Sequence, residues 1–390
     1  MPLPSMNIVI IFVNIGAYHA ARIRAFNAVC KQKGWALTAV QMTSDSLDHP
    51  WGAADNLVDC PIITLQHEQT NCTGKKEVFR LLSRSLDSLK PDAVVIPGWG
   101  YLIAQAAIRW SVRSNVPAIL MSESKQDDEP RTWWKEKLKS LLYVRKFKSA
   151  LVGGCLHKDY LVQLGCPKEA IFFGYDIVDN DYFSNQAQKA RKNPTFARKQ
   201  DSQIPHRPYF IAVARFIPRK NILRLVDAFA QYRRYVEADR AWDLVVCGGG
   251  GTEENAIRDR IAEHQLESSI CLPGFKTYVE MPVWFGLASA FIHPALSEQW
   301  GLVVNEALSS GLPVLVSNRC GCFPELVQEG INGFGFDPED TEQISQLMVK
   351  VSKSNADLDE MSKAALKHIQ RFSPATFGEG LAQAVEYALP

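Results

Sequence analysis

The sequence predicts an α/β protein of two Rossmann-like domains, each a parallel β-sheet between layers of helices. Short apolar, β-branched stretches, the first at residues 7–13, alternate along the chain with stretches of helical periodicity, the first at residues 18–33. This alternation is typical of consecutive βαβ units, in which strands buried on both faces read as continuous apolar runs. The alternation stops after residue 183 and restarts at residue 209. We therefore expect two successive copies of this architecture.

The remaining elements follow from the same two periodicities. Further strands are expected where short apolar runs recur, at residues 35–42, 93–96, 118–121, 151–154, 171–175, 209–213, 244–247 and 288–292. Further helices are expected where apolar residues recur at three- and four-residue spacing, at residues 78–89, 102–114, 223–236, 253–264 and 374–389.

The break between the two halves gives the expected domain boundaries. A chain of 390 residues exceeds the usual size of a single hydrophobic core. The stretch that separates the halves is polar and basic and contains three prolines, Pro194, Pro205 and Pro208. The expected parts are an N-terminal domain, a linker, a C-terminal domain and a final helix, at residues 1–184, 185–207, 208–373 and 374–390.

The composition excludes several classes of protein. With 46% hydrophobic residues, 22% charged residues and a formal net charge of +1, the chain is neither disordered nor strongly basic, so no nucleic-acid partner is expected. No apolar run reaches the length of about 18 residues that a transmembrane helix needs. Residues 1–6 lack the basic start of a secretory signal, and the nine cysteines have irregular spacing. A cytoplasmic location is expected.

The most informative stretch lies at residues 293–311, where an apolar run is followed by a loop and an apolar helix. Gly301, Leu302 and Val303 would form the first helical turn, whose N–H groups lack partners and can bind an anion. Glu306 would lie about 7–8 Å further along the axis. A phosphate on the turn and a diol on Glu306 describe one nucleotide-sized ligand, with Glu298 in the loop left for a second polyol. The alternative is an ordinary strand–loop–helix unit with both carboxylates solvated.

This stretch resembles the Glu-x7-Glu signature of retaining glycosyltransferases of the GT-B fold, family four. The following sequence fits the same family, namely Gly311-Leu-Pro-Val-Leu-Val-Ser, Gly321-Cys-Phe-Pro-Glu325 and Glu329-Gly-Ile-Asn-Gly333. The resemblance implies a GT-B fold, in which two Rossmann-like domains face each other across a cleft and the last helix crosses back to the first domain. It also implies that Glu298 contacts the hydroxyls of the transferred sugar and that Glu306 contacts the ribose.

Two cations follow the strand expected at residues 209–213. Arg215 and Lys220 are five positions apart, and arginine suits bidentate phosphate contacts while lysine supplies a point charge. On the residues alone they would be surface cations. The resemblance implies that both stabilise the departing diphosphate of a nucleotide sugar. Arg219, between them, is expected to be solvated.

Other donor contacts are expected at the ends of neighbouring strands. The glycines at 248–251 follow a strand and precede a helix, but Glu253 stands where a dinucleotide fingerprint has its third glycine. We therefore expect them near a nucleotide but not on NAD. Phe275 either lines the base pocket, as the resemblance implies, or ends a plain strand. The donor-binding set expected in this way is Gly16, Gly248, Gly250, Phe275, Gly301, Leu302, Val303 and Glu306.

Three residues of the first half are candidates for sugar or acceptor contacts: His19, Trp99 and Glu123. His19 follows Gly16 in the position of the family's first glycine-rich loop, where it contacts a ligand or caps a helix. Glu123 stands where the family commonly has a histidine. It either accepts a hydrogen bond from a sugar hydroxyl or lies in an exposed loop.

The resemblance implies a retaining, hexosyltransferase-like enzyme that moves a sugar from a nucleotide-diphosphate donor, expected to be a UDP-sugar, to an acceptor hydroxyl. No cofactor and no metal are expected. Asp179-Asn-Asp181 has the spacing of a metal-binding motif but precedes the linker, and Cys320 and Cys322 lack a second ligand pair. Two other functions stay open, a catalytically decayed nucleotide-sugar-binding protein and an NAD-dependent dehydrogenase.

The acceptor is a sugar, a lipid-linked molecule or another small molecule, and the sequence does not decide among them. Residues 131–148 mix cations with aromatic residues on an expected helix. This helix either packs on the core with a basic solvent face or lies on the inner face of an anionic membrane. Trp133 and Trp134 on it can equally shape the acceptor cleft.

Overall fold

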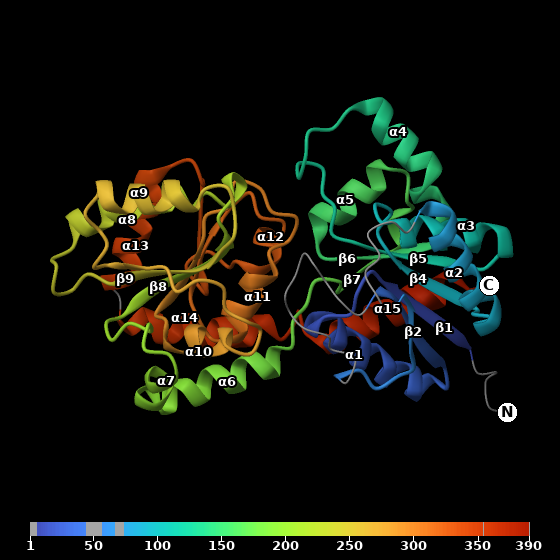
Figure 1. Cartoon of the computed structure of the whole chain (residues 1–390), viewed down its shortest axis with the longest axis horizontal. Coiled ribbons are helices and arrows are strands. Elements are labelled where there is room, and N and C mark those ends of the chain that lie inside the picture. The colour runs from blue at the N-terminus through green and yellow to red at the C-terminus, as the bar shows by residue number, and fades with distance from the viewer. Residues whose placement is uncertain (1–5, 44–56, 67–73, 354, 390) are drawn as a thin grey trace. The chain divides into compact units, whose positions relative to one another are not determined.

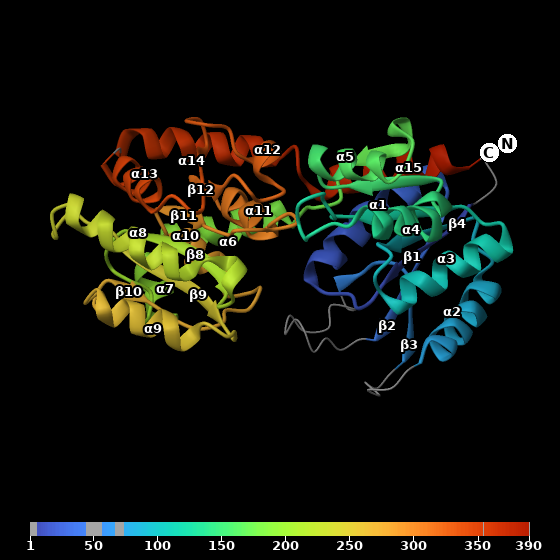
Figure 2. The ribbon, with the colours of Figure 1, turned by 90° about the horizontal axis from the view of Figure 1, so that it is seen from above.

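The computed structural model describes residues 6–43, 57–66, 74–353 and 355–389. The chain forms two compact units: unit 1 comprises Met1–Asp179 and Phe372–Pro390, and unit 2 comprises Asn180–Arg371. Each unit contains one parallel sheet with helices on both faces (Figures 1 and 2). The predicted α/β class with two Rossmann-like domains is confirmed. Within the described ranges, no helix has the length and apolar character needed to cross a bilayer.

Unit 1 has a seven-stranded sheet with the order β3-β2-β1-β4-β5-β6-β7. Its strands are β1 (Asn7–Phe12), β2 (Ala36–Thr43), β3 (Ile62–Gln66), β4 (Ala93–Pro97), β5 (Ala118–Ser122), β6 (Ser149–Val152) and β7 (Ile171–Phe173). Its α-helices are α1 (Ala17–Lys33), α2 (Lys75–Leu89), α3 (Leu102–Ser114), α4 (Trp133–Leu142), α5 (Cys155–Gln163) and α15 (Pro374–Ala388).

Strand β1 shows why the buried strands read as continuous apolar runs. Its side chains alternate between two separate cores, because successive residues of a strand point to opposite faces. Val9 and Ile11 pack in the core under α2 and α3. Ile8 and Ile10 pack in the core formed with α1 and α15. Both faces of the sheet are covered, so every position of this strand after Asn7 is apolar and buried.

Unit 2 has a six-stranded sheet with the order β10-β9-β8-β11-β12-β13. Its strands are β8 (Tyr209–Arg215), β9 (Asp243–Gly249), β10 (Ile270–Cys271), β11 (Ala290–His293), β12 (Val314–Ser317) and β13 (Gly333–Phe336). Its α-helices are α6 (Asn180–Lys192), α7 (Pro194–Gln200), α8 (Ile222–Tyr235), α9 (Glu254–Glu263), α10 (Met281–Leu287), α11 (Leu302–Ser309), α12 (Phe323–Leu326), α13 (Thr341–Lys353) and α14 (Asn355–Ile369).

The stretch expected to be a linker, residues 185–207, is instead largely helical and belongs to unit 2. Helix α6 buries Phe183, Ala187 and Ala190, which are spaced four and three residues apart on one helical face. It packs closely on α10: a Cβ added to Gly286 would lie 2.6 Å from the Ala187 carbonyl oxygen. Two of the three buried residues are alanines, so the stripe is too weakly apolar to stand out from the polar residues around it.

The final helix α15 returns to unit 1 and packs on α1. The two helices approach so closely that a Cβ on Gly378 would lie 2.8 Å from the carbonyl oxygen of Ala25. Ser149 at the start of β6 donates a hydrogen bond of 2.6 Å to the Ala384 carbonyl. The end of the chain therefore completes one face of the first sheet.

The end of β9 lies directly against the end of β8. Ala214 pairs with Gly248 in the parallel register of these strands. Gly248 has φ +133°, and a Cβ there would lie 1.9 Å from the Ala214 carbonyl oxygen, whereas Gly250, with φ +61°, has open space around it. Glycine is required at 248 by both the backbone conformation and the close approach, and at 250 by the conformation alone.

We predict that Gly248→Ala destabilises the protein by about 2–6 kcal/mol, because strain and overlap combine. The matched substitution Gly250→Ala should cost only about 1–2 kcal/mol, since a left-handed conformation is its sole penalty. Urea denaturation of both variants measures the difference. Equal losses would mean that β9 shifts easily away from β8.

Candidate functional site

Each sheet has one place where the order of its strands reverses. The chain builds outward from β8 to β9 and β10, then crosses to the other side of β8 with β11. In unit 1 the same reversal lies between β1 and β4. Open parallel sheets bind ligands at the carboxyl ends of the strands that flank such a point. A ligand site is therefore expected on the segments that follow β8 and β11 in unit 2 and on those that follow β1 and β4 in unit 1.

In unit 2, the segments after β8 and β11 meet at the carboxylate of Glu298. The Lys220 ammonium donates a hydrogen bond to Glu298 Oε2. The Arg219 guanidinium lies 3.3 Å from Oε1 through Nη1. His293 Nε2 lies 3.5 Å from Oε2. Lys220 and Glu298, expected to bind different parts of the donor, are thus in direct contact with each other. Arg219, expected to be solvated, is paired although its side chain is 45% exposed.

Burial and charge act in opposite directions on Glu298. Its side chain is only 13% exposed. Burial alone raises the pKa of this carboxyl, but the adjacent His293 ring and the charge of Lys220 outweigh burial, so the pKa is held well below its usual range. Burial also lowers the pKa of His293. The cluster therefore carries an ionised carboxylate at neutral pH, beside two permanent cations.

Arg215 ends strand β8 and is exposed. Among the residues that the structure describes, no hydrogen bond or ion pair engages its guanidinium. An arginine held at the end of a rigid strand without a partner is available for an anionic ligand. Arg215 and Lys220 lie on the same strand–loop segment, as the sequence predicts.

Gly301 shapes the start of α11. It is the N-cap residue and has φ +107°, a conformation that favours glycine. A Cβ there would lie 3.4 Å from Cγ of Glu298. Leu302 and Val303 follow in the first turn and are half-buried. Glu306 lies one turn further and is 4% exposed.

The glycine segment after β9 and the turn that carries Phe275 lie next to each other. The Gly248 N–H donates a hydrogen bond of 2.9 Å to the Gly274 carbonyl. Phe275 is 51% exposed. Lys276 is turned away into an ion pair of 2.8 Å with Asp201. The structure thus brings the glycines and Phe275 together, on the side of β8 opposite to Glu298 and α11.

In unit 1, Gly16 and His19 form a helix cap. The Gly16 N–H at the start of α1 donates to His19 Nδ1 at 3.2 Å. The His19 ring also packs on Phe12, with 4.6 Å between ring centroids. The same arrangement recurs at α5, where the Gly154 N–H donates to His157 Nδ1 at 3.2 Å. The spacing Gly-x-x-His is therefore a helix-capping arrangement that this unit uses twice, and a ligand contact of His19 stays a prediction.

Trp99 and Glu123 follow strands β4 and β5 of unit 1, and both are half-buried. Glu123 lies close enough to Asp176 that its charge, after burial, contributes to raising the pKa of Asp176. Asp176 is buried beside Arg22, with 3.8 Å between Oδ1 and Nη2. Neither this buried pair nor His293 was predicted from the sequence. Two features of the sequence could have indicated them: Arg22 lies among apolar residues of α1, and His293 ends an apolar strand.

Among the described residues, no group of three or more His, Cys, Asp or Glu side chains gathers in a way that could hold a metal. Asp179, from the Asp-x-Asp spacing, forms an ion pair of 3.0 Å with Arg24. Cys320 and Cys322 are fully buried, and burial raises the pKa of the Cys322 thiol. The absence of a metal requirement stays a prediction.

Residues 195–368 match the sequence model of the family described as Glycosyl transferases group 1. The chain is 27% identical over 181 residues to probable sucrose-phosphate synthase 5 of Oryza sativa subsp. japonica, which covers 43% of this chain. The matched part spans only 18% of the length of that plant protein. The sequence similarity is therefore limited to about half of the chain.

Two solved structures resemble almost the whole chain. A glycosyltransferase from Rickettsia africae has a TM-score of 0.76 and 15% identity, covering 99% of both chains. HepE from Anabaena, solved in complex with UDP-glucose, has a TM-score of 0.75 and 16% identity, covering 98% of this chain and 99% of its own. At such identities the likeness concerns the fold. The chain thus has the GT-B fold, and its residues 195–368 are similar in sequence to the glycosyl transferases group 1 family.

Proposed function

We propose that the protein is a retaining glycosyltransferase that moves a hexose-type sugar from a UDP-linked donor to an acceptor hydroxyl without a metal. The observation that carries this proposal is the group of Arg215, Lys220 and Glu298 at the strand reversal of unit 2, next to α11. A diphosphate needs cations, and a sugar needs a hydrogen-bond acceptor of fixed position. The two segments that follow β8 and β11 supply both, and they meet at the contact between Lys220 and Glu298.

The donor diphosphate is proposed to bind Arg215 and Lys220. Arg215 has no partner among the described residues, and Lys220 is held by Glu298. Arg219, from the same loop, also engages Glu298. An arriving diphosphate would therefore compete with the carboxylate for Lys220. Two charge-assisted contacts to the leaving group stabilise the charge that develops as the glycosidic bond to the donor breaks.

The transferred sugar is proposed to bind Glu298. A carboxylate offers about four lone-pair sites, and Lys220, Arg219 and His293 lie against three of them. One site remains for a sugar hydroxyl, and a second is released if the diphosphate draws Lys220 or Arg219 away. Glu306 is proposed to bind the ribose and the first turn of α11 a phosphate. The glycines 248 and 250 and Phe275 are proposed to lie beside the nucleotide.

In the proposed reaction, the acceptor oxygen attacks the anomeric carbon on the face from which the diphosphate leaves. The bond between that carbon and the phosphate oxygen breaks, and the diphosphate takes the proton of the acceptor hydroxyl. The protein contributes position and charge stabilisation instead of a nucleophile. Trp99 and Glu123 are proposed to face the acceptor or the sugar. The UDP-glucose in the similar Anabaena structure supports a UDP-sugar as donor.

We predict that UDP and a UDP-sugar raise the unfolding temperature of the protein without added metal, whereas NAD does not. A ligand at a hundred times its dissociation constant stabilises the native state by about 2.7 kcal/mol. Glu306→Gln, which keeps the side-chain volume, should weaken UDP binding about tenfold or more through loss of a charge-assisted hydrogen bond. The control Glu360→Gln removes a 75% exposed carboxylate on α14 and should leave binding unchanged. A shift with NAD alone would refute the proposal.

We predict that Arg215→Ala with Lys220→Ala lowers donor turnover by about 10²–10³-fold, because each removes charge stabilisation of the leaving group. Release of UDP from the sugar nucleotide that gives the largest thermal shift measures the effect. Arg258→Ala, which removes a 55% exposed cation on α9, is the matched control. UDP release at the wild-type rate in the double variant would contradict the leaving-group role. Binding of UDP without any turnover in the wild type would indicate a decayed site.

We predict that Glu298→Gln destabilises the protein by about 1–3 kcal/mol at pH 7. The pKa of Glu298 is depressed in the folded protein, so its stabilisation is present above the ordinary value of 4.5 and fades as the pH falls below it. Urea denaturation at pH 7 and pH 4 should show a somewhat smaller gap between the variant and the wild type at pH 4, where the loss has only begun. Arg219→Ala, whose side chain is 45% exposed, should cost less than about 1 kcal/mol. A gap independent of pH would argue against an ionised, paired carboxylate.

A further inference from the structure

Helix α4 in unit 1 presents its apolar side chains to the outside. Five large apolar residues of its ten are about half exposed or more: Trp133 at 77%, Trp134 at 50%, Leu138 at 49%, Leu141 at 48% and Leu142 at 50%. Only Ser140 of this helix is buried. A surface helix of a globular protein normally has the reverse arrangement, with its apolar stripe against the core.

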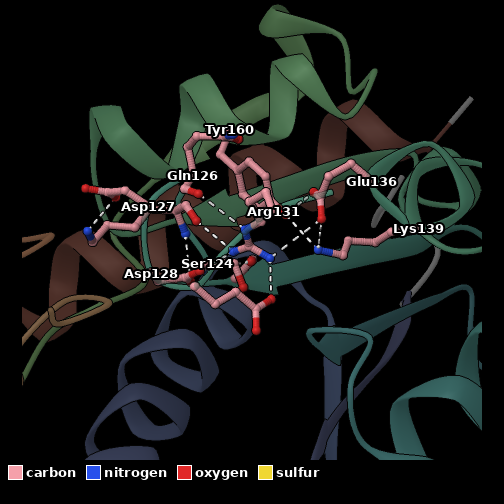
Figure 3. Close-up of polar contacts among 11 residues, drawn as sticks. Ser124, Gln126, Asp127, Asp128, Arg131, Glu136, Lys139 and Tyr160 are labelled. Carbon is pink, nitrogen blue, oxygen red and sulfur yellow. Dashed lines mark hydrogen bonds and ion pairs between the residues drawn. The ribbon is translucent and has the colours of Figure 1, made fainter. Parts of the chain in front are cut away.

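Polar contacts fix the rotation of α4. The Tyr160 hydroxyl of α5 donates to Glu136 Oε2 at 2.5 Å. Lys139 donates to the same hydroxyl at 2.8 Å. The Arg131 guanidinium lies over the Tyr160 ring, 4.7 Å from its centroid. Figure 3 shows Glu136, Lys139 and Arg131 converging on Tyr160.

The loop that leads into α4 is held by the same arginine. Arg131 Nη2 donates to the Lys125 carbonyl at 2.8 Å. Its Nε donates to the Gln126 carbonyl at 3.3 Å. Arg131 also forms an ion pair with Asp128 (Figure 3). Loop and helix are therefore tied together at their inner side, so α4 cannot easily turn its apolar residues inward.

The residues opposite this anchor form a regular stripe. Glu136, Lys139 and Ser140 are three and four positions apart and so share the inner face. Trp134, Leu138 and Leu141 have the same spacing and lie on the opposite face at 3.6 residues per turn. The contacts that hold the inner face therefore leave this apolar stripe on the outside.

Cations flank the stripe. Five basic residues of this segment are exposed: Lys135, Lys137, Arg145, Lys146 and Lys148. The one acid between residues 132 and 148, Glu136, has a side chain that is only 18% exposed and is paired with Lys139. The outer face of α4 therefore combines the stripe of Trp134, Leu138 and Leu141 with positive charge, and the exposed Trp133 stands beside it at the first position of the helix.

We propose that α4 lies on the surface of an anionic bilayer. Trp133, Trp134 and the leucines enter the boundary between headgroups and acyl chains, where tryptophan is favoured, and the lysines contact phosphate headgroups. The charge argues against a second copy of the chain as the occupant. A two-fold dimer through this face would place identical cations opposite each other. The inference does not depend on the proposed catalytic function.

The test is sedimentation of the full chain with phosphatidylcholine vesicles that contain increasing amounts of phosphatidylglycerol. Bound protein should increase with the anionic lipid and decrease with salt, since each cation near the surface contributes an electrostatic attraction. Trp133→Ser with Trp134→Ser should reduce the partition coefficient roughly tenfold or more. Lys135→Glu with Lys137→Glu should remove the dependence on phosphatidylglycerol. Phe196→Ser, at a 57% exposed residue of α7, is the control and should bind as the wild type does.

Thermal unfolding of each variant shows that it is folded, and Leu138→Ser with Leu141→Ser provides a second pair on the same stripe. Failure of the wild-type chain to bind any vesicle would overturn the proposal. Binding that is unaffected by both stripe variants would also overturn it. Concentration-dependent self-association that the same variants abolish would identify the face as a contact between copies of the chain instead.

Discussion

The carboxylate of Glu298 is the group on which the candidate site of unit 2 depends. It joins a loop that follows β8, through Lys220 and Arg219, to the end of β11, through His293. Without it, two cations would face each other beside a buried histidine with no opposite charge. Gly301 beside it has φ +107°, so glycine is favoured there by the backbone conformation, while a Cβ would only reach ordinary contact with Cγ of Glu298. The loops that flank the strand reversal are thus organised by one charge.

Much of the fold follows from the sequence because the strands of both sheets are buried on both faces. Alternation of Val9 and Ile11 with Ile8 and Ile10 between two cores leaves an apolar run that any strand pattern reveals. Helix α6 was not predicted, because its buried stripe consists mainly of alanines. Strand β3 was not predicted, because all of its residues are only half-buried at the edge of the sheet. Hydrophobic periodicity therefore reveals the helices and strands that bury much apolar surface and misses those that bury little.

The candidate site was predictable in its members but not in its contacts. Arg215, Lys220, Glu298 and Glu306 stand out by residue type and motif. The pairing of Lys220 with Glu298 depends on β8 and β11 being neighbours, which a separation of 78 positions in the sequence conceals. His19 illustrates the opposite case. Its position after the first strand resembles a ligand contact, yet its ring serves the Gly16 N–H of α1, a local role that the repeated spacing at Gly154 and His157 also displays.

Helix α4 shows why the orientation of an amphipathic helix is a tertiary property. Its sequence contains an apolar stripe and a polar stripe, and either can face the protein. Tyr160 and Arg131 determine which stripe faces the protein, because the polar stripe contacts the Tyr160 hydroxyl and ring and the Arg131 guanidinium. Glu136 satisfies its charge there, so the apolar stripe is left outside together with the lysines. Leaving two tryptophans in water gives up the stabilisation that burying their apolar surface would provide. That stabilisation is recovered if another surface covers them.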